Sequence, residues 1–242
     1  MGSFLGEVET VIKVKLAPTP ANFNKSVRDP GLDAIRELVG EIPLVKRRGR
    51  KRKKIAESRD LIPSESFPAF WQDAIPDMLR AYNETCAYLA IHIWAGVGTP
   101  TVDHMTAKST SWDKIYEWEN YRLSSGLMNA RKNKYDDVID PFKVVDGLFS
   151  LEFVAFQVSA GPKVDKNSAA IVQSTIARLQ LNSVECCRAR STYVIEYRNG
   201  NINFDFLKRK APFIALEMYN KGEIAIPDMP EAKIFATNRV GT

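Results

Sequence analysis

Cysteine and histidine are scarce in this chain of 242 residues. There are three cysteines, and two of them, Cys186 and Cys187, are adjacent, so neither a disulfide framework nor a zinc-binding quartet can be assembled. We therefore expect a protein of a reducing compartment, the cytoplasm. The histidines are His92 and His104 alone, so any imidazole chemistry must come from one of these two.

Long apolar runs are also missing. No stretch approaches the ~20 apolar residues that a membrane-spanning helix needs, and the N-terminus lacks the basic and apolar regions of a secretory signal. Hydrophobic residues make up 45% and charged residues 26% of the chain, as in ordinary globular proteins. We expect a folded protein without a membrane partner.

Positive charge is concentrated in one segment. The chain has 34 basic and 29 acidic residues, a net charge of +5, and eight of the basic residues lie in segment 46–54. Such a segment can neutralise nucleic-acid phosphates by releasing counterions, or it can form a solvated loop; both interpretations stay open. Its basic residues are Lys46, Arg47, Arg48, Arg50, Lys51, Arg52, Lys53 and Lys54.

Apolar spacing predicts several helices and few strands. The first 60 residues look irregular apart from a short helix over 33–39, and a helix is expected from Asp77 to Cys86. Alternation over 149–153 predicts a half-buried strand, followed by another that ends near Val158. Further helices are expected over 172–179, 182–199 and 212–222. The fold class is therefore α+β, mainly helical with a short β-hairpin.

The pair Asp103-His104 is the first candidate for chemistry. In a regular strand, neighbouring side chains point to opposite faces. At a strand end the chain can turn, so that the carboxylate binds a hard cation while the imidazole activates water. The pair alone is weak, because an acid beside a histidine is common in packed structures.

Three ordered blocks strengthen this interpretation. They are VDHMTAKS (102–109), YEWENYRLSSGLMNARKN (116–133) and DVIDPF (137–142). Together they resemble the HNH endonuclease superfamily, and the branch that reads VDHxxPKS, an asparagine before YRL, and DPF. The resemblance covers residues 82–142, with looser similarity on both sides. We divide the chain into an N-terminal extension (1–62), an HNH core (63–145) and a C-terminal strand and helical region (146–242).

The resemblance implies a ββα-metal motif with assigned roles. His104 would deprotonate the attacking water, and Asn120 would orient it. Asp103 and Asn129 would bind one Mg²⁺ or Mn²⁺, whose remaining ligands are waters and substrate. Lys132, one helical turn after Asn129, would face the same phosphate. Lys108 and Arg131 are further candidates for binding nucleic acid.

The chain departs from the pattern where many relatives bind a structural zinc. Cys86 occupies the first of four cysteine positions, but Leu89, Ser125 and Met128 occupy the others. We therefore expect no structural zinc and apolar packing in its place.

The whole protein is expected to be a metal-dependent endonuclease, with DNA ahead of RNA as substrate. Relatives include nucleases of prokaryotic anti-phage systems that act beside an ATPase, so the resemblance implies antiviral defence and an ATPase partner. One metal site cuts one strand at a time, so a double-strand break would require two sites, as in a homodimer. The alternative is a nucleic-acid-binding or scaffold protein that keeps the fold without cleaving. A Cys-His hydrolase has no support in the spacing.

Overall fold

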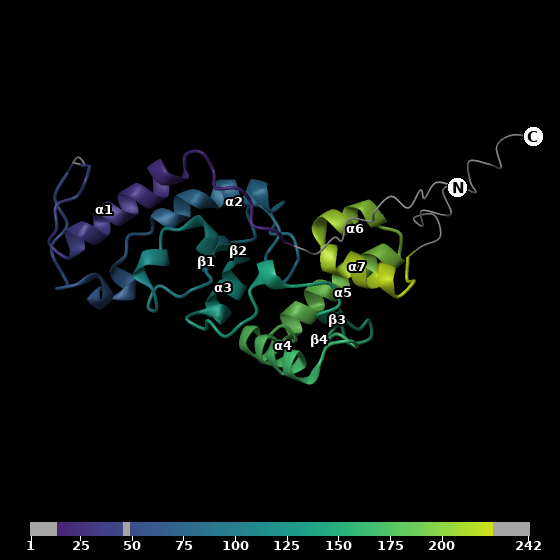
Figure 1. Cartoon of the computed structure of the whole chain (residues 1–242). Helices are drawn as coiled ribbons and strands as arrows, with labels where there is room; N and C mark the ends of the chain where they lie inside the picture. Colours follow the sequence, from purple (N-terminus) through teal and green to yellow (C-terminus); the bar gives the residue numbers. More distant parts are fainter. Residues whose placement is uncertain (1–13, 46–48, 225–242) are drawn as a thin grey trace, which may run out of the picture. The chain divides into compact units, whose positions relative to one another are not determined.

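The computed structural model describes residues 14–45 and 49–224, which form an α+β structure of helices and two small antiparallel sheets (Figure 1). Lys46, Arg47 and Arg48 lie outside the described residues. The strands are β1 (Pro100–His104), β2 (Tyr121–Ser125), β3 (Phe149–Leu151) and β4 (Val158–Ala160). The α-helices are α1 (Asp29–Leu38), α2 (Ile75–Ala81), α3 (Gly126–Lys132), α4 (Lys166–Leu179), α5 (Val184–Arg198), α6 (Phe204–Lys210) and α7 (Pro212–Asn220).

Short helical turns connect these elements. A π-helical turn, Asn24–Arg28, runs directly into α1. The 3-10 turns are Arg59–Leu61, Ser64–Ser66, Phe70–Ala74, Trp112–Lys114, Trp118–Asn120 and Pro141–Lys143. In the part of the chain that the structure describes, no helix is both long and apolar enough to cross a membrane.

The chain forms two compact units. The first, here called the hairpin unit, consists of the described residues of Lys15–Tyr88 and Ile93–Pro141. The second, the helical unit, contains Leu89–His92 and residues 142–224, together with Val14. The described residues of 15–62 therefore belong to the same unit as the three sequence blocks as far as Pro141.

Aromatic side chains fill the core of the hairpin unit. Phe23 makes edge-on contacts with Trp118 and Tyr121, at ring-centroid distances of 5.6 and 5.8 Å. Gly31 of α1 lies against the ring of Tyr116, so closely that an added Cβ would come within 2.4 Å of ring carbons. A glycine is therefore needed where α1 crosses this ring.

The β1–β2 hairpin and α3 form the centre of the hairpin unit. The strands are antiparallel, and Asp103 pairs with Arg122 and His104 with Tyr121. Helix α3 starts directly after β2, because the Ser125 hydroxyl accepts a hydrogen bond from the backbone N–H of Met128 and caps the helix. Two strands and a helix thus follow one another around Asp103 and His104.

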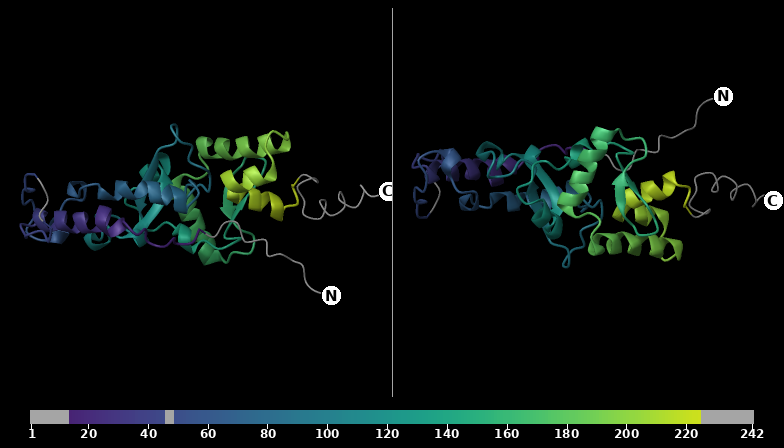
Figure 2. Two further views of the ribbon diagram at one scale, coloured as in Figure 1. Left: turned by 90° about the horizontal axis from the view of Figure 1, so that it is seen from above. Right: turned by 90° about the horizontal axis from the view of Figure 1, so that it is seen from below.

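The helical unit combines a second hairpin with four helices. Strands β3 and β4 pair with Phe149 opposite Ala160, and α4 begins at an N-cap, Asp165, that accepts two backbone N–H bonds. Helices α6 and α7 lie beside each other at the C-terminal end of the described chain (Figures 1 and 2). The Glu217 carboxylate of α7 accepts a hydrogen bond of 2.8 Å from the buried N–H of Leu151, which ties the helix to β3.

Most predicted elements are present, with shifted boundaries. The helices over 172–179, 182–199 and 212–222 are confirmed as α4, α5 and α7. The predicted helix 77–86 ends at Ala81, because Asn83 and Glu84 adopt positive φ values of 50° and 55°. Helix α6 was not predicted, since Leu207 is its one buried residue.

Candidate active site on the β1–β2 hairpin

Asp103 is buried between a tyrosine and a lysine. Its side chain lies in β1 and is 2% exposed. The Tyr88 hydroxyl donates a hydrogen bond of 2.5 Å to its Oδ2, and the Nζ of Lys132 lies 3.6 Å from the same oxygen. Burial raises the pKa of Asp103 to about 6, although the charge of Lys132 opposes the rise. At neutral pH the group is ionised, and Tyr88, Lys132 and Arg122 all favour its charged form.

His104 is packed between two aromatic rings. Its ring centroid lies 5.0 Å from that of Trp71 and 5.2 Å from that of Tyr121. The Nε2 atom lies 3.0 Å from the carbonyl oxygen of Ile115, and because a carbonyl only accepts, Nε2 carries the proton and Nδ1 is the basic nitrogen. Burial lowers the pKa of His104 to about 3. The imidazole is thus neutral at physiological pH, the form that can accept a proton.

Asn120 fixes the loop between the two strands. Its Oδ1 accepts a hydrogen bond of 2.7 Å from the N–H of Thr106, and its Nδ2 donates to the carbonyls of Thr106 and Lys114. The Lys114 carbonyl precedes that of Ile115, the partner of His104. Asn120 therefore holds the backbone of the loop whose next carbonyl, that of Ile115, contacts the imidazole.

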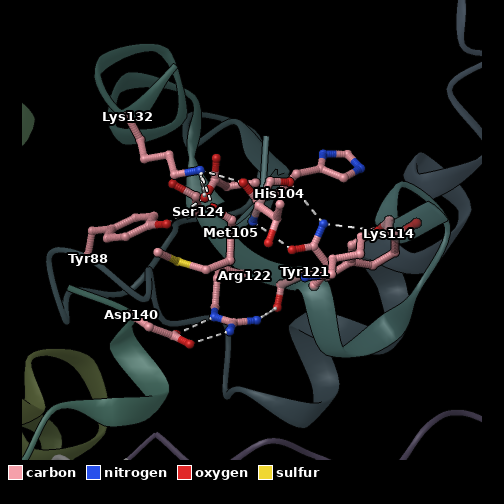
Figure 3. A network of polar contacts seen from close by, with 12 residues as sticks. Tyr88, His104, Met105, Lys114, Tyr121, Arg122, Ser124, Lys132 and Asp140 are labelled. Atoms are coloured by element: carbon pink, nitrogen blue, oxygen red, sulfur yellow. Dashed lines mark hydrogen bonds and ion pairs between the residues drawn. The ribbon is translucent and has the colours of Figure 1, made fainter. Parts of the chain in front are cut away.

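Lys132 points inward. Its side chain is fully buried, and its ammonium donates to the backbone carbonyls of His104 and Met105, as Figure 3 shows. These two bonds and the contact with Asp103 join α3 to the end of β1. This differs from the sequence expectation of a direct phosphate contact, since the ammonium is enclosed by protein groups.

The remaining predicted residues lie nearer the surface. Asn129 is half-buried and precedes Lys132 by three residues, so it lies on the same side of α3. Lys108 is half-buried, with its Nζ 4.3 Å from the ring centroid of Trp71. Arg131 is half-buried on α3.

The basic segment is described from Arg50 onward. Arg52 forms an ion pair of 2.9 Å with Glu37, and Lys54 one of 2.5 Å with Glu57. These acidic partners offset part of the positive charge that the sequence concentrates there. Arg50, Lys51 and Lys53 have exposed side chains.

The structure brings some candidate residues together and separates others. Asp103, Lys132 and the α3 face with Asn129 lie on one side of β1. The ring of His104 lies on the other, as alternation along a strand requires. The turn at the strand end that would bring both side chains to one site is therefore absent from β1 as the structure describes it.

A buried ion pair beside the site could not be read from the sequence. Arg122 donates two hydrogen bonds of 2.7 Å to the two carboxylate oxygens of Asp140, and the guanidinium side chain is 4% exposed (Figure 3). It also donates to the backbone carbonyls of Glu119 and Tyr121. The pair anchors β2 to the DPF block, which is a structural role for two residues of the HNH-like pattern.

Tyr88 and Trp71 are further residues that sequence reasoning did not select. Both reach the site from segments that precede β1, and nothing in their local spacing distinguishes them from core aromatics. Trp118 and Tyr121 are core residues, since these side chains are 1% and 0% exposed. His92 is also packed, at 6% exposed, with Lys210 Nζ 2.9 Å from its Nε2.

The four positions that correspond to the zinc site of HNH endonucleases are distributed over both units. Cys86 and Met128 are buried in the hairpin unit, and the N–H of Ser125 lies 3.4 Å from the Cys86 sulfur. Leu89 belongs to the helical unit. The three cysteines are free thiols.

No family model matches the chain, and no characterised protein matches it. The resemblance to HNH endonucleases accordingly rests on the three sequence blocks.

A hard divalent cation fits the donors that the chain offers. Both contacts of the Asp103 carboxylate are made by Oδ2, which leaves Oδ1 as a donor. Asn129, half-buried on α3, carries an amide oxygen. Oxygen donors of this kind suit Mg²⁺ or Mn²⁺, which retain several waters. Among the described residues, no group of three or more His, Cys, Asp or Glu side chains is arranged around a metal position.

Proposed function

We propose that this chain is a metal-dependent endonuclease that hydrolyses phosphodiester bonds in nucleic acid, DNA ahead of RNA. The observation that carries the proposal is the order of the blocks in space. Asp103-His104 ends one strand, its antiparallel partner follows Asn120, and the next helix carries Asn129. That order is the one that the sequence resemblance to HNH endonucleases requires.

The roles are those that the sequence resemblance implies, and the contacts of the residues show what holds them in place. Nδ1 of the neutral His104 would take the proton of the attacking water, which requires the end of β1 to turn so that the ring and the Asp103 carboxylate reach one phosphate. Asp103 and Asn129 would hold Mg²⁺ or Mn²⁺, which supplies charge stabilisation at the phosphate and at the leaving oxygen. Tyr88 and Lys132 position the Asp103 carboxylate, and Asn120 holds the loop that fixes His104. Because Trp71 covers one side of the imidazole, substrate must displace or stack on this side chain.

Cleavage of nucleic acid tests the proposal directly. Supercoiled plasmid and structured RNA are incubated with purified protein and Mg²⁺ or Mn²⁺, with EDTA as the metal-free control. We expect nicking that requires the metal and is lost in His104→Ala and Asp103→Asn. His92→Gln is the matched control, because His92 lies in the helical unit and should leave cleavage intact. Cleavage that survives His104→Ala would refute the assigned site.

Metal binding can be measured apart from cleavage. A ligand that binds the folded state alone raises the melting temperature by mass action. We therefore expect Mn²⁺ to raise the melting temperature of the wild type, and to leave that of Asp103→Asn unchanged. An equal increase in both proteins would place the metal elsewhere.

A second candidate is a nucleic-acid-binding or scaffold protein that does not cleave. The burial of His104, at 7% exposed, and the enclosure of Lys132 favour it. It predicts salt-sensitive binding that weakens when the basic residues of segment 46–54 are neutralised, without metal-dependent nicking.

The biological setting is also a proposal. A cytoplasmic role in defence against phage, beside an ATPase partner, follows from the HNH branch that the sequence resembles. If such a partner gates the enzyme, cleavage by the isolated chain should rise when the ATPase is added. Double-strand cutting by a homodimer would appear as a second-order dependence of linear product on protein concentration.

A further inference from the structure

Three aromatic side chains near the candidate site each carry a cation on one face. The Lys108 ammonium lies 4.3 Å from the ring centroid of Trp71. The guanidinium of Arg59 lies 5.0 Å from the ring of Trp112, and that of Arg52 lies 5.7 Å from the ring of Phe70. We name this set of residues the cation–aromatic surface; it comprises Arg52, Arg59, Phe70, Trp71, Lys108 and Trp112.

The cation–aromatic surface leads to His104. Phe70 and Trp71 are consecutive residues of one 3-10 turn, and the ring of Trp71 contacts His104 edge-on at 5.0 Å. Lys108 and Trp112 belong to the loop that follows β1, where the N–H of Ser111 bonds to the carbonyl of Ala107. The three pairs therefore come from neighbouring parts of the hairpin unit.

All six side chains are half-buried, so each is supported by the fold and still reachable from solvent. A cation beside an aromatic face offers both contacts that a nucleotide makes: the cation binds phosphate and the ring stacks on a base. Bases in a duplex already stack on one another and cannot offer their faces to side chains. Unpaired bases can, so this combination favours a single strand.

We propose that the cation–aromatic surface binds an unpaired nucleic-acid strand and delivers it to the site of Asp103 and His104. This inference rests on the proposed function and names its substrate class. A base that stacks on Trp71 displaces the Lys108 ammonium, which then binds the adjoining phosphate. Arg52 and Arg59 stay ion-paired with Glu37 and Glu41, at 2.9 and 2.7 Å. A base stacked on Trp71 brings its phosphate beside Lys108 and next to His104.

Binding of defined oligonucleotides tests this inference. Fluorescence anisotropy in EDTA compares a labelled oligothymidylate with a duplex of the same length. We expect the single strand to bind at least about tenfold more tightly, and Trp112→Leu to weaken it about tenfold, as the loss of one stacked base does. Duplex binding should change less than about twofold, because it depends on charge. Trp112→Phe, which keeps a stacking ring, should restore single-strand binding.

A matched control lies in the helical unit. The ammonium of Lys208 lies 5.4 Å from the ring of Phe204, so Phe204→Leu removes a pair of the same kind away from the cation–aromatic surface. Phe204→Leu should leave the affinities for the single strand and for the duplex unchanged. Melting curves of all variants separate loss of binding from loss of folding. An equal loss for both probes in Trp112→Leu, or no loss in a folded Trp112→Leu, would overturn the inference.

The two proposals fail in distinguishable ways. Single-strand preference without metal-dependent cleavage would refute the nuclease and keep the cation–aromatic surface. Metal-dependent cleavage of plasmid with equal affinity for single strand and duplex would keep the nuclease and refute the surface.

Discussion

The buried imidazole of His104 should make stability depend on pH in a defined direction. The unfolded chain protonates this histidine near pH 6.5, whereas burial lowers the folded-state pKa to about 3. The contribution of the buried His104 to the free energy of unfolding is therefore complete above pH 6.5. It decreases as the pH falls, by about 1.4 kcal/mol per pH unit. Asp103 acts in the opposite direction, since its raised pKa favours the folded state as the pH falls from about 6.

Comparing His104→Gln with the wild type isolates the histidine, because Asp103 is present in both. We expect the difference in the free energy of unfolding to shrink as the pH falls from 6.5 to 4.5, measured by urea denaturation without metal. Parallel pH profiles would show that His104 titrates normally in the folded state.

Removing the charge of Asp140 should destabilise the hairpin unit. The Arg122 guanidinium would stay buried and lose its carboxylate partner, which costs about 3 kcal/mol for a buried pair. Chemical denaturation of Asp140→Asn measures this loss. Asp60→Asn, at an exposed position, is the control and should change the free energy of unfolding by less than about 0.5 kcal/mol. Equal effects would mean that the pair contributes nothing.

At the scale of elements, a glycine-to-alanine substitution in α1 should change the free energy of unfolding in the direction opposite to the usual one. Replacing an exposed glycine within a helix by alanine normally raises the free energy of unfolding by about 1 kcal/mol. Gly31→Ala should instead lower the free energy of unfolding by about 1–3 kcal/mol, because the new Cβ would overlap the rigid ring of Tyr116, 2.4 Å away. Gly126→Ala in α3 is the control, since its Cβ would meet nothing closer than 3.4 Å. A stabilised Gly31→Ala would show that the helix can move off the ring.

Elements with a regular apolar face could be predicted from the sequence. Val172, Ile176 and Leu179 are buried in α4 as their spacing predicts. Helix α1 begins at Asp29, earlier than the predicted 33–39, and its buried residue Gly31 falls outside the predicted helix.

The candidate site could be predicted only in part, because some of its contacts join segments that are far apart in the sequence. The residues of β1 and α3 were found because they lie in ordered blocks, but their partners come from distant segments. Tyr88 reaches Asp103 from 15 residues away in sequence, and Arg122 reaches Asp140 from 18. Such pairs depend on tertiary packing, which no local pattern encodes. The enclosure of Lys132 has the same origin.

At the scale of the whole molecule, the two units are interleaved along the chain. Leu89–His92 belongs to the helical unit although its flanking residues belong to the hairpin unit. The N–H of His92 bonds to the carbonyl of Lys210 at 2.8 Å, and the side chains of the two residues are in contact. Ile91 and His92 are both buried.

A shortened chain that ends after Pro141 should therefore be less soluble and less stable than a chain that also contains the helical unit. It keeps the hairpin unit but exposes Ile91 and His92, which lose the helices that contain their partners. We expect aggregation in size-exclusion chromatography, and recovery when residues 142–224 are supplied as a separate polypeptide. A monomeric, cooperatively melting fragment would contradict this expectation.

The bond between His92 and Lys210 also sets an order of events during synthesis. Its partners are 118 residues apart, so His92 leaves the ribosome long before Lys210 has been translated. All residues of the hairpin unit have been synthesised once Pro141 has left the ribosome. This unit can then fold while Leu89–His92 still lacks its partners in the helical unit. Chaperone binding to this short segment would be most needed in that interval, and a translational pause after Pro141 would lengthen it. All residues of the candidate site have thus been synthesised before the helical unit, which contains the partners of Leu89–His92.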